Sequence, residues 1–157
     1  MDKALLVLRQ YTTGAELLLC GVPIAPAWGK TDFCHIGNDI HIDWEFAMLK
    51  TLKVPERPSN YLSLQNTMAR FIINSKGFMN DPDVFILRDS DQKMDFEERK
   101  TLFLINWLMG ALVFTSDKIE DYNSDQKKIC SIFMDDEDPV IMSSKMDERM
   151  VYIDFHY

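Results

Sequence analysis

The stretch that decides the fold is Asn80-Asp81-Pro82-Asp83-Val84-Phe85-Ile86-Leu87-Arg88, in which two acids flank a proline and an unbroken apolar run follows. Four apolar residues are too few for a helix and are typical of a strand buried on both faces. Pro82 can precede such a strand because no N–H is needed there. Carboxylates at the mouth of a buried strand are costly unless they are paired, so Asp81 and Asp83 indicate a functional site.

Similar units of strand, loop and helix occur on both sides of this stretch. The sequence predicts strands over residues 16–20, 33–37, 84–87 and 111–115. It predicts helices over residues 59–75, 96–110 and 124–133, and a short one over 44–49. Asp95 and Glu98 have the spacing of a capping box at the start of the second of these helices. Strands that alternate with helices predict parallel βαβ units and the α/β class.

Polar pairs close the predicted strands: Cys20-Gly21, Asn38-Asp39, Arg88-Asp89 and Ser116-Asp117. In a (β/α)₈ TIM barrel, chemistry lies at the carboxyl ends of the strands. Four βα units amount to half of such a barrel, which we assign to residues 1–134. Apolar and polar residues alternate from Val151 to His156, a pattern that predicts a strand. We therefore interpret residues 135–157 as the truncated start of a C-terminal β domain.

Composition limits the classes of function. The chain has 157 residues, enough for one domain, and 46% of them are hydrophobic, which permits a core. The net charge of −8 argues against nucleic acid as a partner. Three widely spaced cysteines, Cys20, Cys34 and Cys130, form no disulfide framework or zinc ribbon. We expect Cys20 and Cys34 to be small buried residues. No long apolar stretch or signal peptide is visible, so we expect a soluble, cytoplasmic protein without a membrane partner.

Four motifs follow one another along the chain: Cys20-Gly21-Val22-Pro23-Ile24, the segment 29–39 ending in Ile36-Gly37-Asn38-Asp39, Phe78-Met79-Asn80-Asp81-Pro82-Asp83, and Thr115-Ser116-Asp117. In this order they resemble the α-galactosidase barrel of glycoside hydrolase families 27 and 36, more closely family 36. The resemblance covers residues 16–134 and implies strands five to eight of the barrel. It also implies retaining hydrolysis of α-linked galactosides, such as raffinose-type oligosaccharides, by two carboxylates and without a cofactor.

The resemblance assigns roles to single residues. Asp39 matches the acid/base, Asp83 matches a sugar-pocket aspartate, and Cys20 and Gly21 match the pocket wall. His35 stands where the family usually has an arginine that binds sugar hydroxyls, so specificity differs or the site is weakened.

Other residues are judged from the sequence itself. Trp28, in a loop, is a candidate for stacking on a sugar ring, whereas Trp44 and Trp107 are expected in the core. Asp81 is a pocket residue or a turn former beside Pro82.

Several alternatives stay open. His35, Asp39, His41 and Asp43 allow a metal site, because the last three would share one face of a strand; we expect no metal, since the family needs none. The family's nucleophile lies in a Lys-x-Asp motif on the fourth strand, and no such motif precedes Glu16. The chain alone is therefore expected to be inactive, as a non-catalytic remnant or as a half-barrel that needs its N-terminal partner. Free edges at residues 17–19 and 112–114 predict that partner or self-association. An unrelated α/β sugar-binding module is the third alternative.

Overall fold

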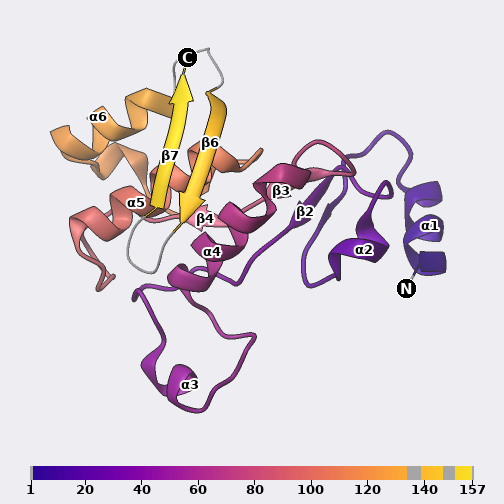
Figure 1. The fold of residues 1–157 in the computed structure, drawn as a ribbon, viewed down its shortest axis with the longest axis horizontal. Helices are drawn as coiled ribbons and strands as arrows, with labels where there is room; N and C mark the ends of the chain where they lie inside the picture. The colour runs from indigo at the N-terminus through magenta and orange to yellow at the C-terminus, as the bar shows by residue number, and fades with distance from the viewer. Residues whose placement is uncertain (1, 134–138, 147–150, 157) are drawn as a thin grey trace.

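A computed structural model of the chain describes residues 2–133, 139–146 and 151–156. Short parallel strands run through the middle of an elongated molecule, with α1 at one end and α6 at the other (Figure 1). The helices are α1 (Asp2–Tyr11), α2 (Ile24–Ala27), α3 (Ala47–Thr51), α4 (Asn60–Arg70), α5 (Phe96–Met109) and α6 (Ser124–Phe133), with 3₁₀ turns at Phe71–Ile73 and Ile119–Asp121. The strands are β1 (Leu18–Leu19), β2 (Phe33–His35), β3 (Met79–Asp81), β4 (Val84–Phe85), β5 (Phe114–Thr115), β6 (Val140–Met146) and β7 (Val151–His156).

The parallel strands form two sheets, β1-β2-β3 and β4-β5, and not one continuous barrel sheet. The predicted strand at 84–87 is shorter than expected, and β3 was not predicted at all. The chain from β3 to β4 is interrupted by Pro82, which has no N–H, and by Asp83, whose φ is +79°. Its first part pairs with β2 and its second part with β5. Asn80–Asp83 therefore precede β4 as predicted, but they also span the carboxyl end of β3, which was not predicted.

The main core lies around α5. Its capping box is formed: Glu98 N–H donates to Asp95 (2.9 Å), and Asp95 N–H donates to Glu98 (3.0 Å). The buried Phe103 packs edge-on against Phe85 of β4 with 5.0 Å between ring centroids. The predicted helices at 96–110 and 124–133 are thus confirmed as α5 and α6, and the one at 59–75 as α4 followed by a 3₁₀ turn.

The described residues after α6, 139–146 and 151–156, fold back onto α5. β6 and β7 pair as an antiparallel hairpin, and β6 was not predicted. Phe155 of β7 lies edge-on against Trp107 of α5, 6.3 Å between centroids. Trp107 is buried, and Trp44 packs partly buried against the same core, as expected.

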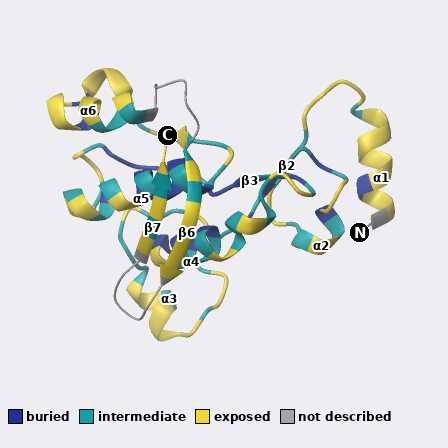
Figure 2. Cartoon of the chain, turned by 45° about the horizontal axis from the view of Figure 1, so that its top comes forward, coloured by how far each residue is buried: buried dark blue, intermediate teal, exposed yellow. Residues whose placement is uncertain are grey.

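A smaller apolar cluster supports β1, β2 and β3. It consists of Ala27, Cys34, Ile36 and Phe78, all buried. Figure 2 shows buried segments near α2 and β2. The unpredicted α1 is joined to this part by Arg9, which donates two hydrogen bonds to Asp32 (2.6 and 2.9 Å). Among the described residues, none of the helices combines the length and apolarity that crossing a membrane requires.

Candidate functional site

The candidate site lies at the carboxyl ends of β2 and β3. Parallel pairing places His35 opposite Asp81, and the Ile36 N–H donates to the Asp81 carbonyl (3.0 Å). This register carries the segment after β2 past the turn after β3. As a consequence, His35, Asp39 and Asp83 each contribute one atom that could bind a metal ion. These three atoms lie within 4.8 Å of one another. Three residues that sequence analysis selected separately are thus neighbours.

Asp83 is held rigidly. Its Oδ2 accepts the Ile40 N–H (2.8 Å), its Oδ1 accepts the Val84 N–H (2.7 Å), and its own N–H donates to Asp81 Oδ1 (3.0 Å). These bonds stabilise its left-handed backbone, which aspartate tolerates better than most residues. Both oxygens are therefore fixed acceptors whose direction is set by the backbone.

His35 lies between two carboxylates. Its Nδ1 is 3.5 Å from Asp81 Oδ2, and its Nε2 is 3.7 Å from Asp39 Oδ1. The contact with Asp81 raises the pKa of His35 most; burial opposes this rise, and the charges of Asp81, Asp83 and Asp39 add to it. The imidazole therefore carries a positive charge more readily than a free histidine, a partial substitute for an arginine.

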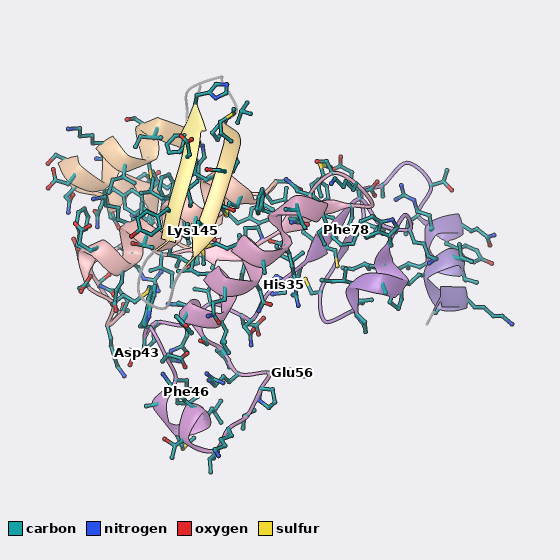
Figure 3. The ribbon with its side chains drawn as sticks, viewed as in Figure 1. His35, Asp43, Phe46, Glu56, Phe78 and Lys145 are labelled. Carbon is teal, nitrogen blue, oxygen red and sulfur yellow. The ribbon has the colours of Figure 1, made fainter. Side chains whose placement is uncertain are left out.

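A cavity of about 770 Å³ opens beside this cluster, a volume suited to a small molecule. Its lining includes Gly21, His35, Asp39, Arg57 and Arg70. Gly21 has a φ of +68°, a conformation that suits glycine. Figure 3 shows His35 in the middle of the molecule and Glu56, which also lines the cavity, on the projecting loop that carries α3.

Cys20 and Trp28 occupy different surroundings from each other. Cys20 is exposed, so the prediction of a buried residue is wrong for Cys20 and correct for Cys34. The pKa of the Cys20 thiol is raised by partial burial and by Asp81, Asp83 and Asp39, which indicates that it lies near the acids. Trp28 lies at the other end of β3, packed against Gly77 and edge-on against Phe78 (5.7 Å between centroids). The structure therefore does not bring Trp28 to the cavity.

The metal cluster considered from sequence is not formed as such. The His41 ring stacks on Phe46 (5.0 Å), and the Asp43 N–H donates to His41 Nδ1 (3.1 Å). Asp43 also pairs with Lys93 (3.4 Å). The loop after Asp39 is not a strand, so its side chains do not alternate as that hypothesis required.

The two arginines of the cavity were not predicted from the sequence. Arg70, in the last turn of α4, donates to the Ile36 carbonyl, and Arg57 pairs with Glu45 (3.2 Å). Arg70 stands near the end of a predicted helix, which was only a weak signal that it lines the cavity. The length of a helix does not show which strand end its last residues approach.

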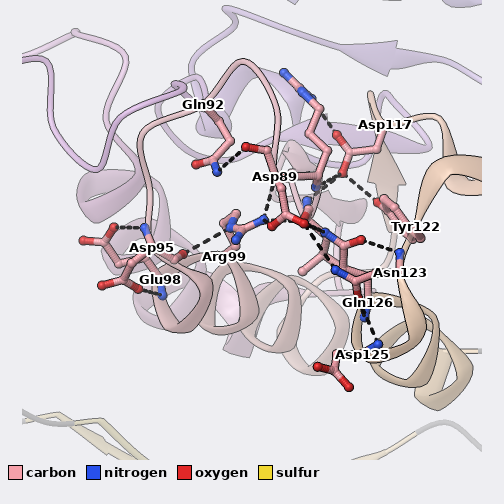
Figure 4. A network of polar contacts seen from close by, with 12 residues as sticks. Asp89, Gln92, Asp95, Glu98, Arg99, Asp117, Tyr122, Asn123, Asp125 and Gln126 are labelled. Atoms are coloured by element: carbon pink, nitrogen blue, oxygen red, sulfur yellow. Dashed lines mark hydrogen bonds and ion pairs between the residues drawn. The ribbon is translucent and has the colours of Figure 1, made fainter.

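A second polar network lies at the carboxyl ends of β4 and β5 (Figure 4). The Asp117 side chain is fully buried and accepts hydrogen bonds from the Leu87 N–H (2.6 Å), the Arg88 N–H (2.9 Å) and the Tyr122 hydroxyl (2.6 Å). Arg99 donates to Asp89 (2.7 Å). Because these acceptors are met by donors within the fold, this network joins α5 and α6 to the sheet and is not a ligand site.

Comparisons with known proteins identify the fold of this chain. No family model matches the chain. The α-galactosidase from Thermus thermophilus in complex with p-nitrophenyl α-D-galactopyranoside superposes with a TM-score of 0.80 and 22% identity, over 97% of this chain and 31% of that chain. The same enzyme in complex with stachyose gives 0.77 and 26%, over 87% and 30%. The chain thus has an α-galactosidase-like fold and spans about 31% of that enzyme's length.

Proposed function

We propose that this chain is the C-terminal half of an α-galactosidase-type (β/α)₈ barrel, close to glycoside hydrolase family 36, and that its cavity takes a terminal α-galactosyl unit. The observation that carries the proposal is the convergence of His35, Asp39 and Asp83 beside a cavity of about 770 Å³ at the ends of two adjacent parallel strands. Barrel enzymes place their chemistry at this end. Structural neighbours with bound p-nitrophenyl galactoside and stachyose support this substrate class.

In this proposal Asp39 is the general acid/base. Its side chain is 79% exposed at the cavity, so it can reach a glycosidic oxygen. In retaining hydrolysis a carboxylate attacks the anomeric carbon while the acid protonates the leaving oxygen, and the same residue then takes a proton from water. His35, Gly21 and Cys20 would form the wall around the sugar.

Asp83 is a holder of hydroxyls rather than the nucleophile. Its oxygen lies within 4.8 Å of Asp39, near the spacing of about 5 Å in retaining enzymes. Both of its oxygens, however, already accept backbone N–H bonds, which lowers their reactivity. We therefore expect a nucleophile from another strand.

The second candidate is a half-barrel that depends on a partner chain. Without such a partner the chain is a non-catalytic remnant. The half-barrel is favoured by the strand edges: β1 and β5 each pair with one strand among the described residues. Leu18 of β1 and Phe114 of β5 are 39% and 46% exposed. Since the two sheets are separate, β3 and β4 are edge strands as well, and an N-terminal half-barrel would pair with the edges at β1 and β5.

Galactoside binding tests the proposal directly. Calorimetric titration of the chain with galactose, in the presence of a chelator, should give saturable binding that Asp83→Asn weakens about tenfold. The matched control is Asp43→Asn, an acid outside the cavity that pairs with Lys93. Equal affinity for glucose, or no loss in Asp83→Asn, would contradict the proposed pocket.

A further inference from the structure

We propose that His35, Asp39 and Asp83 also form a binding site for one divalent transition-metal cation, of which zinc is the best match. One donor atom from each residue lies within 4.8 Å of the others. One imidazole nitrogen and two carboxylate oxygens are ligands that zinc accepts. Three protein ligands would leave one position for water or another small ligand.

His35 is the residue that points to a cation. Its side chain is 9% exposed, and its buried Nε2 has no hydrogen-bond partner within the part of the chain that the structure describes. The other ring nitrogen, Nδ1, faces Asp81 Oδ2 at 3.5 Å. Metal-binding histidines typically donate one N–H to a carboxylate, which fixes the tautomer and directs the other nitrogen's lone pair at the ion. Asp81 and His35 have this arrangement.

The two acids contribute in different ways. Asp83 is fixed by the Ile40 and Val84 N–H groups, and each of its oxygens keeps a second lone pair for coordination. Asp39 is 79% exposed and can rotate. Ligand atoms around tetrahedral zinc are about 3.3 Å apart, given zinc–ligand bonds of roughly 2.0–2.1 Å. The three ligand atoms lie within 4.8 Å of one another, so the exposed Asp39 side chain would swing inward to bring them to this spacing.

The local charge favours a cation. Three carboxylates, of Asp39, Asp81 and Asp83, surround the single imidazole of His35. The arginines that line the cavity have other acceptors: Arg57 pairs with Glu45, and Arg70 donates to the Ile36 carbonyl. A divalent cation would balance the negative charge of the three carboxylates, which these arginines do not neutralise.

This inference goes beyond the proposed function and does not rest on it. A bound ion uses the Asp39 carboxylate that glycoside hydrolysis would need as acid. Zinc and galactoside should therefore exclude each other.

The test is calorimetric titration of the full chain with zinc. All variants carry Cys20→Ser, because the exposed Cys20 thiol lies near the same acids and cysteine sulfur is a common zinc ligand. We expect one zinc per chain and at least a tenfold loss of affinity in both His35→Gln and Asp39→Asn. Asp81→Asn should weaken zinc binding by about 10–100-fold, because Asp81 orients the His35 ring that binds the ion. Asp43→Asn is the control and should bind zinc unchanged.

Copper provides a second measurement on the same proteins. Its electron paramagnetic resonance spectrum should show coupling to one imidazole nitrogen, lost in His35→Gln. The proposal is overturned by an absence of saturable zinc binding, by undiminished affinity in Asp39→Asn, or by coupling that survives His35→Gln. Asp39 is exposed, so its substitution tests the site without unfolding the chain. Galactose titration with a chelator tests the glycoside proposal separately, so the two failures are distinguishable.

Discussion

The Nδ1 of His35 lies 3.5 Å from the Oδ2 of Asp81, and the two residues are opposite each other in the register of β2 and β3. Strand pairing therefore fixes this contact directly. Since His35 stands where the resembling family has an arginine, its environment decides how far an imidazole can take over that role.

Restoring the arginine tests this substitution. Arg presents a permanent charge and several donors in a planar fork, whereas His35 has two ring nitrogens, of which Nδ1 faces Asp81. His35→Arg should strengthen galactose binding about tenfold, equivalent to ~1.4 kcal/mol, measured by titration with a chelator. His41→Arg, on the loop outside the cavity, should have no effect. Weaker binding in His35→Arg would indicate that His35 marks a different sugar.

The chain by itself should not hydrolyse an aryl α-galactoside. Asp83, the carboxylate near Asp39, is engaged by two backbone N–H groups and is a poor nucleophile. Release of nitrophenol from p-nitrophenyl α-D-galactopyranoside should stay at the rate of buffer, for this chain and for Asp39→Ala alike. Turnover that is lost in Asp83→Asn would instead identify Asp83 as the nucleophile.

Asp117 should stabilise the fold at neutral pH and less in acid. Burial favours its protonated form, but bonds from Tyr122, the Leu87 N–H and Arg88 outweigh burial and lower the pKa of Asp117. Its stabilisation is therefore complete above the unfolded value of about 3.9 and is lost as pH falls through the lower folded value.

Urea unfolding of Asp117→Asn measures this effect. The variant should lose about 2–4 kcal/mol of unfolding free energy at neutral pH, because a buried charged acceptor with several donors is removed. The difference should shrink below about pH 4. Asp121→Asn, at an exposed acid paired with Lys118, is the control. A difference that stays constant into acid would show that the Asp117 charge is not responsible.

Trp28 should stabilise the fold and not contact sugar. A Cβ on Gly77 would approach the Trp28 ring to 2.3 Å, so Gly77→Ala should cost about 1–3 kcal/mol. In the Trp28→Ala background the same change should cost much less, as a double-mutant cycle of unfolding free energies would show. Galactose affinity should be unchanged in Trp28→Ala. A large loss of affinity would return Trp28 to the sugar site.

The strand edges should cause self-association. β1 and β5 each have one partner strand among the described residues, and open apolar edges pair with other chains. Light scattering should report dimers or larger species, and the double variant Leu18→Lys with Phe114→Lys should shift the mass toward the monomer. Ile72→Lys changes an apolar residue that is more exposed than either and lies on the 3₁₀ turn, so it should not change the mass. A monomeric parent chain at high concentration would contradict this expectation.

The sequence alone determined the features that depend on local bonds. The bounds of α5 and α6 follow from short-range signals, of which the Asp95–Glu98 capping box is the clearest, and its two bonds join residues three apart. The βα alternation and the choice of His35, Asp39 and Asp83 also came from sequence patterns and the family resemblance.

Tertiary structure decided which of these residues meet. Asp83 joins His35 and Asp39 because β3 pairs with β2 in one register, a contact between segments more than forty residues apart. Trp28 shares a loop with the pocket motif but is directed to the other end of β3 by a hydrogen bond from the Gly29 N–H to the Gly77 carbonyl (2.9 Å). Strands of two or three residues carry almost no periodicity of their own. Their length, register and partners are fixed only when distant segments exchange backbone hydrogen bonds, and the position of every side chain at the site follows from that pairing.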